Sequence, residues 1–458
     1  MTIKSDFKNS AEGMKYKLGQ GLCLAKWKQV SLHLSTGLNH SCYHPALHDI
    51  NPEQVKINPA ALHNTDFKKD QRKIMLKHER PKECGVCWQH EDAGHLSDRH
   101  YRSSEPWAAV DFDAIKNSTG DEDWVPSYVE VNFSSVCNLK CSYCSPQFSS
   151  SWMSEVQALG GYPTNTAHND PAHFIGRRTP IPNREDNPYV EAFWKWWPTL
   201  YPELKHFRMT GGEPLMDPNT YRVFDYVLAN PKSDLHLAVT SNFSVEPKLF
   251  DRHIEYVKRL CDSGIEHYMQ YVSIDSGIAG QAEYIRHGLD FQRLKDNVER
   301  YLSEVTHHNS ITFIVTVNNL SITGLQPLME WIQDLRSRHN TTYQRVWMDT
   351  PALRAPSHQS IALLSRAYQL KLARLIHWMS ERPMAADSFV GFKDYEIDRM
   401  KRVLSMMREE PAQLNLTKGD FYKFFSEHDR RRGTDFLETF PEMREFWQEC
   451  KYYAETLR

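Results

Sequence analysis

The sequence lacks several features that would assign it to a particular class of protein. It contains no run of about 18 apolar residues, so it predicts no membrane-spanning helix. Its N-terminal segment has no apolar stretch of the kind that a secretory signal needs. Internal repeats and low-complexity segments are missing as well. These absences predict a globular protein of a reducing, cytoplasmic compartment with no membrane partner.

A strong excess of either charge is also missing. Lys and Arg together number 55 and Asp and Glu number 58, which gives a net charge of -3. The charge balance therefore gives no reason to expect nucleic acid as a partner. Hydrophobic residues make up 40% and charged residues 25% of the 458 residues. A globular composition at this length predicts two or three domains.

The middle of the chain alternates short apolar strands with helical segments. This alternation predicts parallel strand pairing and an α/β domain of six strand–helix units. One polar insert, residues 160–186, interrupts the first unit and is predicted to form a loop over the site. After about residue 359 amphipathic helices take over. The six predicted strands are 127–133, 206–214, 235–242, 268–276, 311–318 and 344–349.

Cys137, Cys141 and Cys144 form a C-x3-C-x2-C pattern directly after the first predicted strand. Three thiolates can hold three irons of a 4Fe–4S cube and leave the fourth iron open to bind and reduce a ligand. A zinc site or a set of buried thiols is the alternative, because C-x2-C alone is common. The position after a strand favours the functional interpretation, because sites of α/β proteins gather at strand ends.

A second pattern, Gly211-Gly212-Glu213, ends the next predicted strand. Consecutive glycines allow a ligand to approach the backbone closely. The carboxylate of Glu213 can receive a ligand's ammonium group. The two patterns together predict one ligand-binding site.

The three cysteines, with Tyr143 before the last of them, and the following Gly-Gly-Glu resemble the radical S-adenosylmethionine (SAM) superfamily. The resemblance implies a partial (β/α)6, TIM-like barrel that is open on one side. It implies that the open iron of the 4Fe–4S cluster chelates SAM, and that one-electron reduction cleaves SAM to methionine and a 5′-deoxyadenosyl radical. It also implies an electron donor such as flavodoxin or ferredoxin.

Other residues match positions at which the family binds SAM. Arg286 resembles an arginine that pairs with the SAM carboxylate, although a surface helix charge is the alternative. Asn318 matches an adenine contact, and an ordinary strand-end cap is an equally good interpretation. Gly212 and Glu213 would contact the SAM amino group. The residues with an expected role in cofactor binding are Tyr143, Gly211, Gly212, Glu213, the ribose candidates Ser241, Asn242, Ser273 and Asp275, and Arg286 and Asn318.

A separate set of four cysteines, Cys23, Cys42, Cys84 and Cys87, precedes the strands. By spacing alone this set could hold structural zinc. The surrounding sequence, including "CLAKW", "STGLNHSCYHP" and "PKECGVCWQHEDAG", resembles the SPASM and twitch modules that carry auxiliary 4Fe–4S clusters. The resemblance favours a second, closed 4Fe–4S cluster, which suits electron transfer. The module precedes the barrel here, whereas it usually follows it. Nearby histidines are interpreted as solvated or hydrogen-bonded surface residues: His33, His40, His44 and His48.

These expectations give three predicted domains: a cluster module at 1–110, the barrel at 111–358 and a helical region at 359–458. The leading hypothesis is an enzyme that abstracts a hydrogen from a ribosomal peptide or peptide-like natural product and thereby cross-links, oxidises or epimerises it. The alternative is a dehydrogenase or epimerase of a carbohydrate or small metabolite. A non-catalytic iron–sulfur protein is the alternative of another class.

Two further thiols and one aromatic segment complete the set of candidates. An epimerase needs a hydrogen donor, and Cys450 is the candidate for that role. Cys261 ends a predicted helix, where a structural role is favoured. The aromatic segment 193–202 is predicted to pack in the core or an interface.

Overall fold

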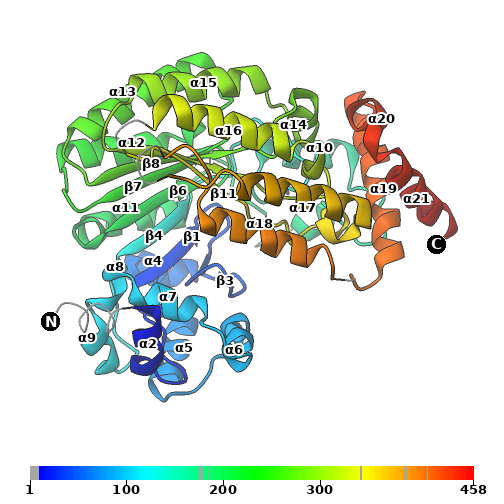
Figure 1. The fold of residues 1–458 in the computed structure, drawn as a ribbon. Helices are drawn as coiled ribbons and strands as arrows, with labels where there is room; N and C mark the ends of the chain where they lie inside the picture. The colour runs from blue at the N-terminus through cyan, green and yellow to red at the C-terminus, as the bar shows by residue number, and fades with distance from the viewer. Residues whose placement is uncertain are drawn as a thin grey trace. The chain divides into compact units, whose positions relative to one another are not determined.

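A computed structural model describes residues 10–174, 179–183, 185–340, 343–385, 389–409 and 411–457 (Figure 1). Its contacts divide the chain into two compact units, which are described separately below. Unit 1 comprises Met1–Ser135, Pro180–Gly211 and Lys232–Ala238, and unit 2 comprises Val136–Thr179, Gly212–Pro231 and Val239–Arg458. Of the predicted insert 160–186, residues 175–178 and 184 lie outside the described residues.

Unit 1 contains a mixed sheet in which strand β1 was not predicted from the sequence. The strands are, in spatial order, β6 (His206–Thr210), β4 (Tyr128–Asn132), β1 (Gln29–His33), β2 (Leu38–His40) and β3 (His48–Asp49). β1 pairs in parallel with β4, and β4 with β6, whereas β2 and β3 join as antiparallel strands. The N-terminal segment therefore supplies a strand that continues the parallel sheet.

The sheet of unit 1 has one apolar face, which packs against helix α11 (Pro188–Leu200). Phe207 of β6 lies on this face, and its ring centroid is 6.2 Å from that of Phe193 and 5.0 Å from that of Trp197. Burial of such large rings supplies much of the stabilisation of a packed layer. The prediction that the aromatic segment 193–202 packs in the core is thus consistent with the buried rings of this helix.

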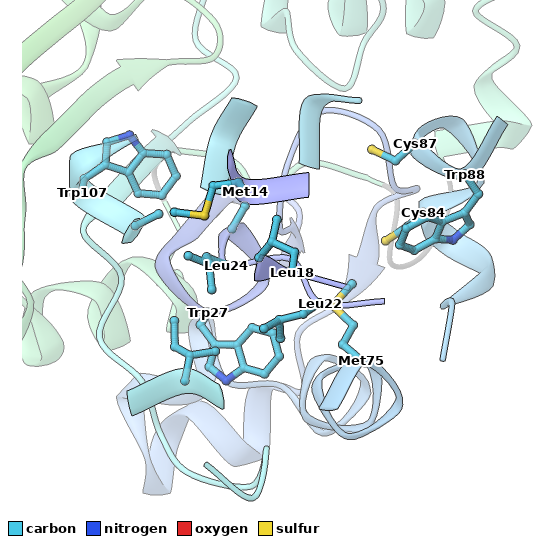
Figure 2. Close-up of a cluster of buried hydrophobic side chains, with 13 residues drawn as sticks. Met14, Leu18, Leu22, Leu24, Trp27, Met75, Cys84, Cys87, Trp88 and Trp107 are labelled. Carbon is cyan, nitrogen blue, oxygen red and sulfur yellow. The ribbon is translucent and has the colours of Figure 1, made fainter. Parts of the chain in front are cut away.

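Short helices surround a second core in unit 1, shown in Figure 2. Trp27, Met14 and Leu18 are almost completely buried there, and Cys84 and Cys87 lie at its edge beside Trp88. The remaining helices of unit 1 are α2 (Ala11–Lys17), α3 (Ala25–Lys28), α4 (Pro52–Ile57), α5 (Asp66–Leu76), α6 (Gly85–Asp92), α7 (Asp98–Ser104), α8 (Pro106–Ala109), α9 (Phe112–Lys116) and the 3-10 helices η1 (Pro59–Leu62), η2 (Lys82–Cys84) and η5 (Tyr201–Glu203).

Unit 2 contains parallel strands as well. β8 (His267–Ser273), β10 (Asn309–Ile314) and β11 (Val346–Asp349) pair in parallel in that order. A separate antiparallel pair joins β5 (Lys140–Cys141) to β9 (Arg286–His287). The boundary between the units falls within β7 (His236–Ser241). Each of the six predicted strands is present, and the predicted α/β fold with parallel strands, that of a partial barrel, is confirmed.

The helices of unit 2 follow its strands and then continue alone. α13 begins with Pro247 and buries Phe250, Ile254 and Val257 at helical spacing, which explains why it packs as an amphipathic helix. The helices are α10 (Ser150–Leu159), α12 (Pro218–Ala229), α13 (Pro247–Asp262), α14 (Ala279–Ile285), α15 (Phe291–Glu304), α16 (Leu325–His339), α17 (Arg366–Ser380), α18 (Asp394–Met406), α19 (Leu414–Arg432), α20 (Phe436–Thr439), α21 (Arg444–Thr456) and the 3-10 helices η3 (Pro171–Phe174), η6 (Pro214–Met216), η7 (Ser321–Thr323), η8 (Ser357–Gln359), η9 (Ile361–Leu363) and η10 (Pro441–Met443).

Beyond residue 359 the described part of the chain forms helices α17 to α21 and no strand of the sheet, as predicted (Figure 1). α19 and α21 pack closely against each other. Among the described residues, no helix is both long and apolar enough to cross a membrane.

Candidate functional site

The three cysteines of the C-x3-C-x2-C pattern lie in a loop that the start of α10 holds in place. The backbone N–H of Cys144 donates to the carbonyl of Cys141 at 2.9 Å, which closes a tight turn. Ser151 Oγ donates to the carbonyl of Cys137 at 2.7 Å. All three thiols are free and half-buried. Their burial raises the pKa of each thiol, well above its ordinary value for Cys137 and to about 12 for Cys144.

Tyr143, within the cysteine loop, belongs to a buried cluster with Asp275 and Arg286. Arg286 Nε donates to Asp275 Oδ2 at 2.7 Å and Arg286 Nη2 donates to Asp275 Oδ1 at 3.2 Å. Tyr143 Oη donates to Asp275 Oδ2 at 2.9 Å, and Arg286 Nη1 lies 3.6 Å from Cys141 Sγ. The antiparallel pairing of β5 with β9 places Arg286 opposite Cys141. One arginine thus links the cysteine loop to the strand end at Asp275.

Arg286 is not the surface helix charge that the sequence left as an alternative, because only 6% of it is exposed. The carboxylate of Asp275 is engaged by Arg286, by Tyr143 and by the backbone N–H of Thr316. Ser273 is the last residue of β8 and pairs with Ile314 of β10. The roles of these residues toward SAM stay a prediction.

Replacing Arg286 by Met is expected to lower the free energy of unfolding by about 3–5 kcal/mol, because it leaves the carboxylate of Asp275 buried without a cation. Urea denaturation of the metal-free protein measures this loss. The double variant Arg286→Met/Asp275→Asn should recover part of the stability, because it removes the stranded charge. If the single variant were as stable as the wild type, the ion pair between Arg286 and Asp275 would not stabilise the fold as predicted.

Glu213 is a buried carboxylate, with 1% of the residue exposed. Its Oε2 accepts a hydrogen bond from the backbone N–H of Asn242 at 2.7 Å, and its Oε1 accepts one from Leu215 at 3.1 Å. Burial raises the pKa of Glu213 to about 7, and these hydrogen bonds, with that of Ser241, only partly oppose it. None of these partners is a cation. The ammonium group of a ligand would therefore supply the positive charge that pairs with this carboxylate.

Glu213 predicts a pH dependence of stability in the ligand-free protein. Its pKa is about 7 in the folded protein against an ordinary value of 4.5, so the folded state binds the proton more tightly. The stabilisation from this group is complete below pH 4.5 and is lost as the pH rises through 7, by about 3 kcal/mol in all.

The control for this prediction is Glu213→Gln, which cannot titrate. Thermal melts of wild type and variant at a series of pH values should show that the wild type loses stability relative to the variant as the pH rises from 5 to 8. Parallel pH profiles for the two proteins would show that Glu213 titrates as an ordinary carboxyl group.

Residues at the end of β7 support Glu213. Ser241 Oγ accepts a hydrogen bond from the backbone N–H of Phe243 at 2.9 Å, and Asn242 Nδ2 donates to Asn138 Oδ1 at 2.7 Å. Asn138 lies between Cys137 and Cys141, so this contact connects the cysteine loop to the end of β7. The predicted residues Glu213, Ser241 and Asn242 therefore lie together with the cysteine loop.

Gly211 and Asn318, two of the other predicted cofactor-binding residues, contact residues of the chain itself. In unit 1, Gly211 has a φ of +122°, and a Cβ there would lie 2.5 Å from the side chain of Asn132, so only glycine fits. Its neighbour Gly212 follows at the start of the second segment of unit 2. In unit 2, the side chain of Asn318 donates to Thr316 and accepts from Leu320 and Ser321, which is the capping arrangement.

The four N-terminal cysteines line a single cavity of unit 1. Burial raises the pKa of Cys42 to about 11 and the pKa of Cys84 and of Cys87 to about 12. Lys26 lines the same cavity and forms an ion pair with Glu83. Burial alone would lower the pKa of Lys26, and the nearby Cys84 and Glu83 outweigh this effect and raise it. Lys26 was not predicted from the sequence, because its Ala-Lys-Trp surroundings resemble an ordinary helix.

The histidines near these cysteines are more buried than predicted. His33 and His40 are half-buried and their Nε2 atoms lie 3.3 Å apart. His48 bonds to Thr65 at 3.1 Å, and His44 bonds to Asp98 at 2.7 Å and also lines the cavity. The expectation of hydrogen-bonded residues holds, and all four histidines are half-buried, so they are less exposed than expected of surface residues.

Neither set of cysteines is gathered as closely as the ligands of a single ion. Within the described ranges, no three or more His, Cys, Asp or Glu side chains are placed to hold a metal ion. Zinc holds its thiolates about 2.3 Å from one point, whereas an iron–sulfur cube spreads its ligands further apart. The metal content of the protein distinguishes the two.

The two spare thiols are buried away from the residues described above. Cys450 of α21 is completely buried, and its charged neighbours are Glu449 and Lys418. Cys261 of α13 is 2% exposed and its Sγ lies 3.9 Å from the carbonyl of His308. The predicted role of Cys450 as a hydrogen donor stays a prediction, and these contacts do not support it.

The first part of the polar insert packs within unit 2. The backbone N–H groups of Asn165 and Thr166 donate to the carboxylate of Asp420 in α19, the latter at 2.9 Å. Asn169 Nδ2 donates to the carbonyl of Cys144 at 3.2 Å. The insert thus contacts the cysteine loop directly.

Comparison with known proteins decides the family of this segment. Residues 131–332 match the family described as the Radical SAM superfamily. The chain carries a radical SAM domain. The matched segment includes the three cysteines, Glu213, Arg286 and Asn318. The radical SAM part of the recognition made from the sequence is confirmed, whereas its SPASM- or twitch-like module stays a prediction. The matched domain supports an enzyme, and it implies SAM and one 4Fe–4S cluster as cofactors.

Relatives of the radical SAM domain are distant. A GTP 3',8-cyclase of Aliarcobacter butzleri (strain RM4018) is 24% identical over 217 residues, which is 46% of this chain and 52% of that protein. The chain thus spans about half the length of this curated relative. The structure of anSMEcpe with bound AdoMet and Kp18Cys peptide aligns over 55% of this chain and 60% of that chain, with 13% identity and a TM-score of 0.34. SuiB of Streptococcus suis bound to S-adenosylmethionine aligns over 69% and 64%, with 12% identity and the same TM-score.

Proposed function

We propose that the protein reductively cleaves SAM and uses the resulting radical to abstract a hydrogen from a peptide substrate. The observation that carries the first part is the contact between the cysteine loop and the surroundings of Glu213. Asn138 of the loop bonds to Asn242, whose backbone N–H bonds to Glu213. A set of three thiols and a buried carboxylate without a cation therefore lie in one place.

The residues present fit the two implied groups. Cys137, Cys141 and Cys144 supply three soft thiolate ligands, which suit an iron–sulfur cluster. Glu213 would hold the SAM ammonium group, because a cation is what its buried carboxylate lacks. When bound, the cluster supplies one electron to SAM and thereby generates the 5′-deoxyadenosyl radical.

The chain's own contribution is to position and shield these groups. Arg286 fixes Tyr143 and lies beside Cys141, so it holds the cysteine loop against the end of β8. Its positive charge also stabilises a thiolate at Cys141. Asp275 is completely buried beside it and Tyr143 is half-buried, which limits the access of water to this side of the loop.

The proposal includes a second 4Fe–4S cluster on Cys23, Cys42, Cys84 and Cys87, in a SPASM- or twitch-like module at residues 1–110 that precedes the barrel domain 111–358 and the helical region 359–458. The cavity that the four thiols share supports a common metal centre, and the resemblance of the surrounding sequence favours a cluster. Four protein ligands close such a cluster, so it would accept the electron that an oxidised substrate radical gives up.

A peptide is the proposed substrate because the polar insert offers an extended surface at the cysteine loop. The insert contacts Cys144 through Asn169 and is fixed to α19 at Asp420. An extended substrate needs such a surface beyond the site of chemistry. The second candidate is a carbohydrate or small metabolite, and a closed second cluster would serve its oxidation equally well.

The experiment that tests this proposal compares substrate classes. The anaerobically reconstituted enzyme is incubated with SAM and dithionite, and 5′-deoxyadenosine is measured with added peptide pools or sugar nucleotides. Peptides should raise its formation and should themselves lose hydrogen or change mass. Stimulation by sugar nucleotides alone would replace the peptide with a carbohydrate, and a fully loaded protein that forms no 5′-deoxyadenosine would support a non-catalytic iron–sulfur protein.

Compartment and partners follow from the same proposal. The nine cysteines are free thiols, which suits a reducing, cytoplasmic compartment. Cleavage of SAM needs an electron, and a flavodoxin or ferredoxin is the proposed donor.

A further inference from the structure

The first part of the cysteine loop is held by the helix that follows it. Side chains of α10 and of its N-cap residue donate hydrogen bonds to backbone carbonyls of the loop. These bonds run from Ser151 Oγ to Cys137, from Ser149 Oγ to Leu139 and from Trp152 Nε1 to Cys141, at 2.7, 2.7 and 2.9 Å. This part of the loop therefore depends on its own neighbours in the chain.

The second part of the loop is held by segments that are more distant in the sequence. Gln359 Nε2 donates to the carbonyl of Ser142 at 3.0 Å, and Ser142 Oγ donates to Gln359 Oε1 at 2.8 Å. Asn169 Nδ2 donates to the carbonyl of Cys144 at 3.2 Å. Ser142 lies between Cys141 and Cys144, so two expected ligands of the SAM-binding cluster flank a residue that Gln359 holds at two points.

Burial makes these bonds costly to lose. Gln359 and Ser142 are each 0% exposed, and Asn169 is 4% exposed. The backbone N–H of Ser142 donates to the carbonyl of Ile285 at 2.7 Å, so every polar group of Ser142 has a partner. Water cannot replace a partner that is removed from such a place. The position of Ser142 is therefore fixed by its contacts with other parts of unit 2.

The two segments that hold this part of the loop contact each other. The ring of His358, next to Gln359, lies 5.2 Å from the ring of His168, next to Asn169. Phe424 of α19 packs against both rings, at 4.8 Å from His358 and 5.2 Å from His168. The polar insert, η8 and α19 thus form one packed support for the turn.

Gln359 lies outside the segment that matches the Radical SAM superfamily, because that segment ends at residue 332. It is the last residue of η8, which precedes the C-terminal helices. The matched segment alone therefore does not supply the residue that holds Ser142.

We propose that Gln359 and Asn169 are positioning residues: they hold the turn from Cys141 to Cys144 in the conformation that binds the SAM-binding cluster. Residues that orient the ligands of a metal centre commonly change its affinity tenfold or more when they are replaced. A turn that is ordered before the cluster arrives also avoids the entropy cost of ordering it then. This inference rests on the proposed function for the identity of the three cysteines as ligands of that cluster.

The first test uses the full-length, metal-free protein and needs neither cluster nor SAM. Iodoacetamide labels the thiols under native conditions, and mass spectrometry of the digested protein gives the rate at each cysteine. Gln359→Met should be labelled about tenfold faster than the wild type at Cys141 and Cys144, because two buried hydrogen bonds no longer oppose opening of the turn. Cys23 of unit 1 should be labelled equally fast in both proteins.

The second test uses the anaerobically reconstituted protein and follows the electron paramagnetic resonance spectrum of the reduced sample. Addition of SAM should change the spectrum of the wild type. Gln359→Met should need about tenfold more SAM for the same change, or show no SAM-dependent change, because its cysteine turn no longer holds the cluster in place.

The matched control is Gln270→Met. Gln270 of β8 is also 0% exposed, and its Nε2 donates to the carbonyls of Val239 and Tyr271 at 3.1 and 3.0 Å. Both variants should lower the melting temperature, because each leaves buried carbonyls without a donor. The control should nevertheless keep the wild-type labelling rates at Cys141 and Cys144 and the wild-type response to SAM.

Asn169→Gly tests the second positioning residue and serves if Gln359→Met fails to fold. Asn169 has a φ of +52°, which glycine adopts without strain, so this variant removes the amide and keeps the backbone. One hydrogen bond is lost in place of two. The variant should therefore show faster labelling of Cys144 and a weaker response to SAM, each on a smaller scale.

Two outcomes would overturn the inference. Wild-type labelling rates and a wild-type response to SAM in both variants would show that the turn does not need these residues. Equally faster labelling of Cys23 and Cys261 would show a general loosening of the fold. If both readouts change as expected but the wild type forms no 5′-deoxyadenosine, the proposed reaction fails while the positioning of the cluster stands.

Discussion

Replacing Cys137 by Ala is expected to abolish the formation of 5′-deoxyadenosine from SAM and dithionite. Cys137, Cys141 and Cys144 supply the only protein ligands of the proposed SAM-binding cluster, and one iron must already stay open for SAM. A cube with two protein ligands is not held, so both the bound iron and the bound SAM are lost. Anaerobic reconstitution followed by chromatography and mass spectrometry of the products measures the effect.

The control for Cys137→Ala is Cys261→Ala. Cys261 is buried in α13 and is likewise a free thiol, so its loss reports any general effect of removing a cysteine. This variant should form 5′-deoxyadenosine at the wild-type rate. Product formation that persists in Cys137→Ala would refute the assignment of this cluster.

The double variant Cys84→Ala/Cys87→Ala is expected to bind about four irons fewer than the wild type, because it removes half of the ligands of the second proposed cluster. Iron and sulfide analysis of the reconstituted protein measures the loss. The cluster on Cys137, Cys141 and Cys144 should remain, so the variant should still cleave SAM when no substrate is present.

The metal content of the wild type distinguishes the alternatives at this second site. One zinc per chain, lost in the double variant, would show that the four cysteines hold structural zinc. A variant that keeps the full iron content of the wild type would show that Cys84 and Cys87 are ordinary buried thiols.

The sequence predicted the elements whose signal is local. A few neighbouring residues are enough to recognise the apolar alternation of β4, β6 and β8 and the spacing of Cys137, Cys141 and Cys144. Gly211 could be expected as well, because its positive φ and its contact with Asn132 tolerate no side chain.

Contacts between distant residues could not be predicted in this way. β1 is a short strand whose place depends on its register with β4, some hundred residues later. Arg286 meets Tyr143 and Cys141 only because β9 pairs with β5. Lys26 enters the four-cysteine cavity through packing of short helices. In each case the contact joins residues that are distant in the chain, and a single sequence does not show which distant residues pair.

The unpartnered polar side chains of β1 could not be predicted from the sequence either. Gln29 and Ser31 are ordinary residues for a half-exposed strand, and only their complete burial makes them notable. The sequence named the candidate residues of the radical chemistry, whereas the structure shows which of them are in contact, as Asn242 is with Glu213 and Asn138.

The central claim is that SAM binds directly to the open iron of the cluster on Cys137, Cys141 and Cys144. Electron–nuclear double resonance of the reduced protein, with SAM isotopically labelled at its amino nitrogen, tests this claim most directly. We predict a coupling between that nitrogen and the cluster, and its loss in Cys137→Ala. A fully loaded cluster that shows no coupling at saturating SAM would contradict the claim.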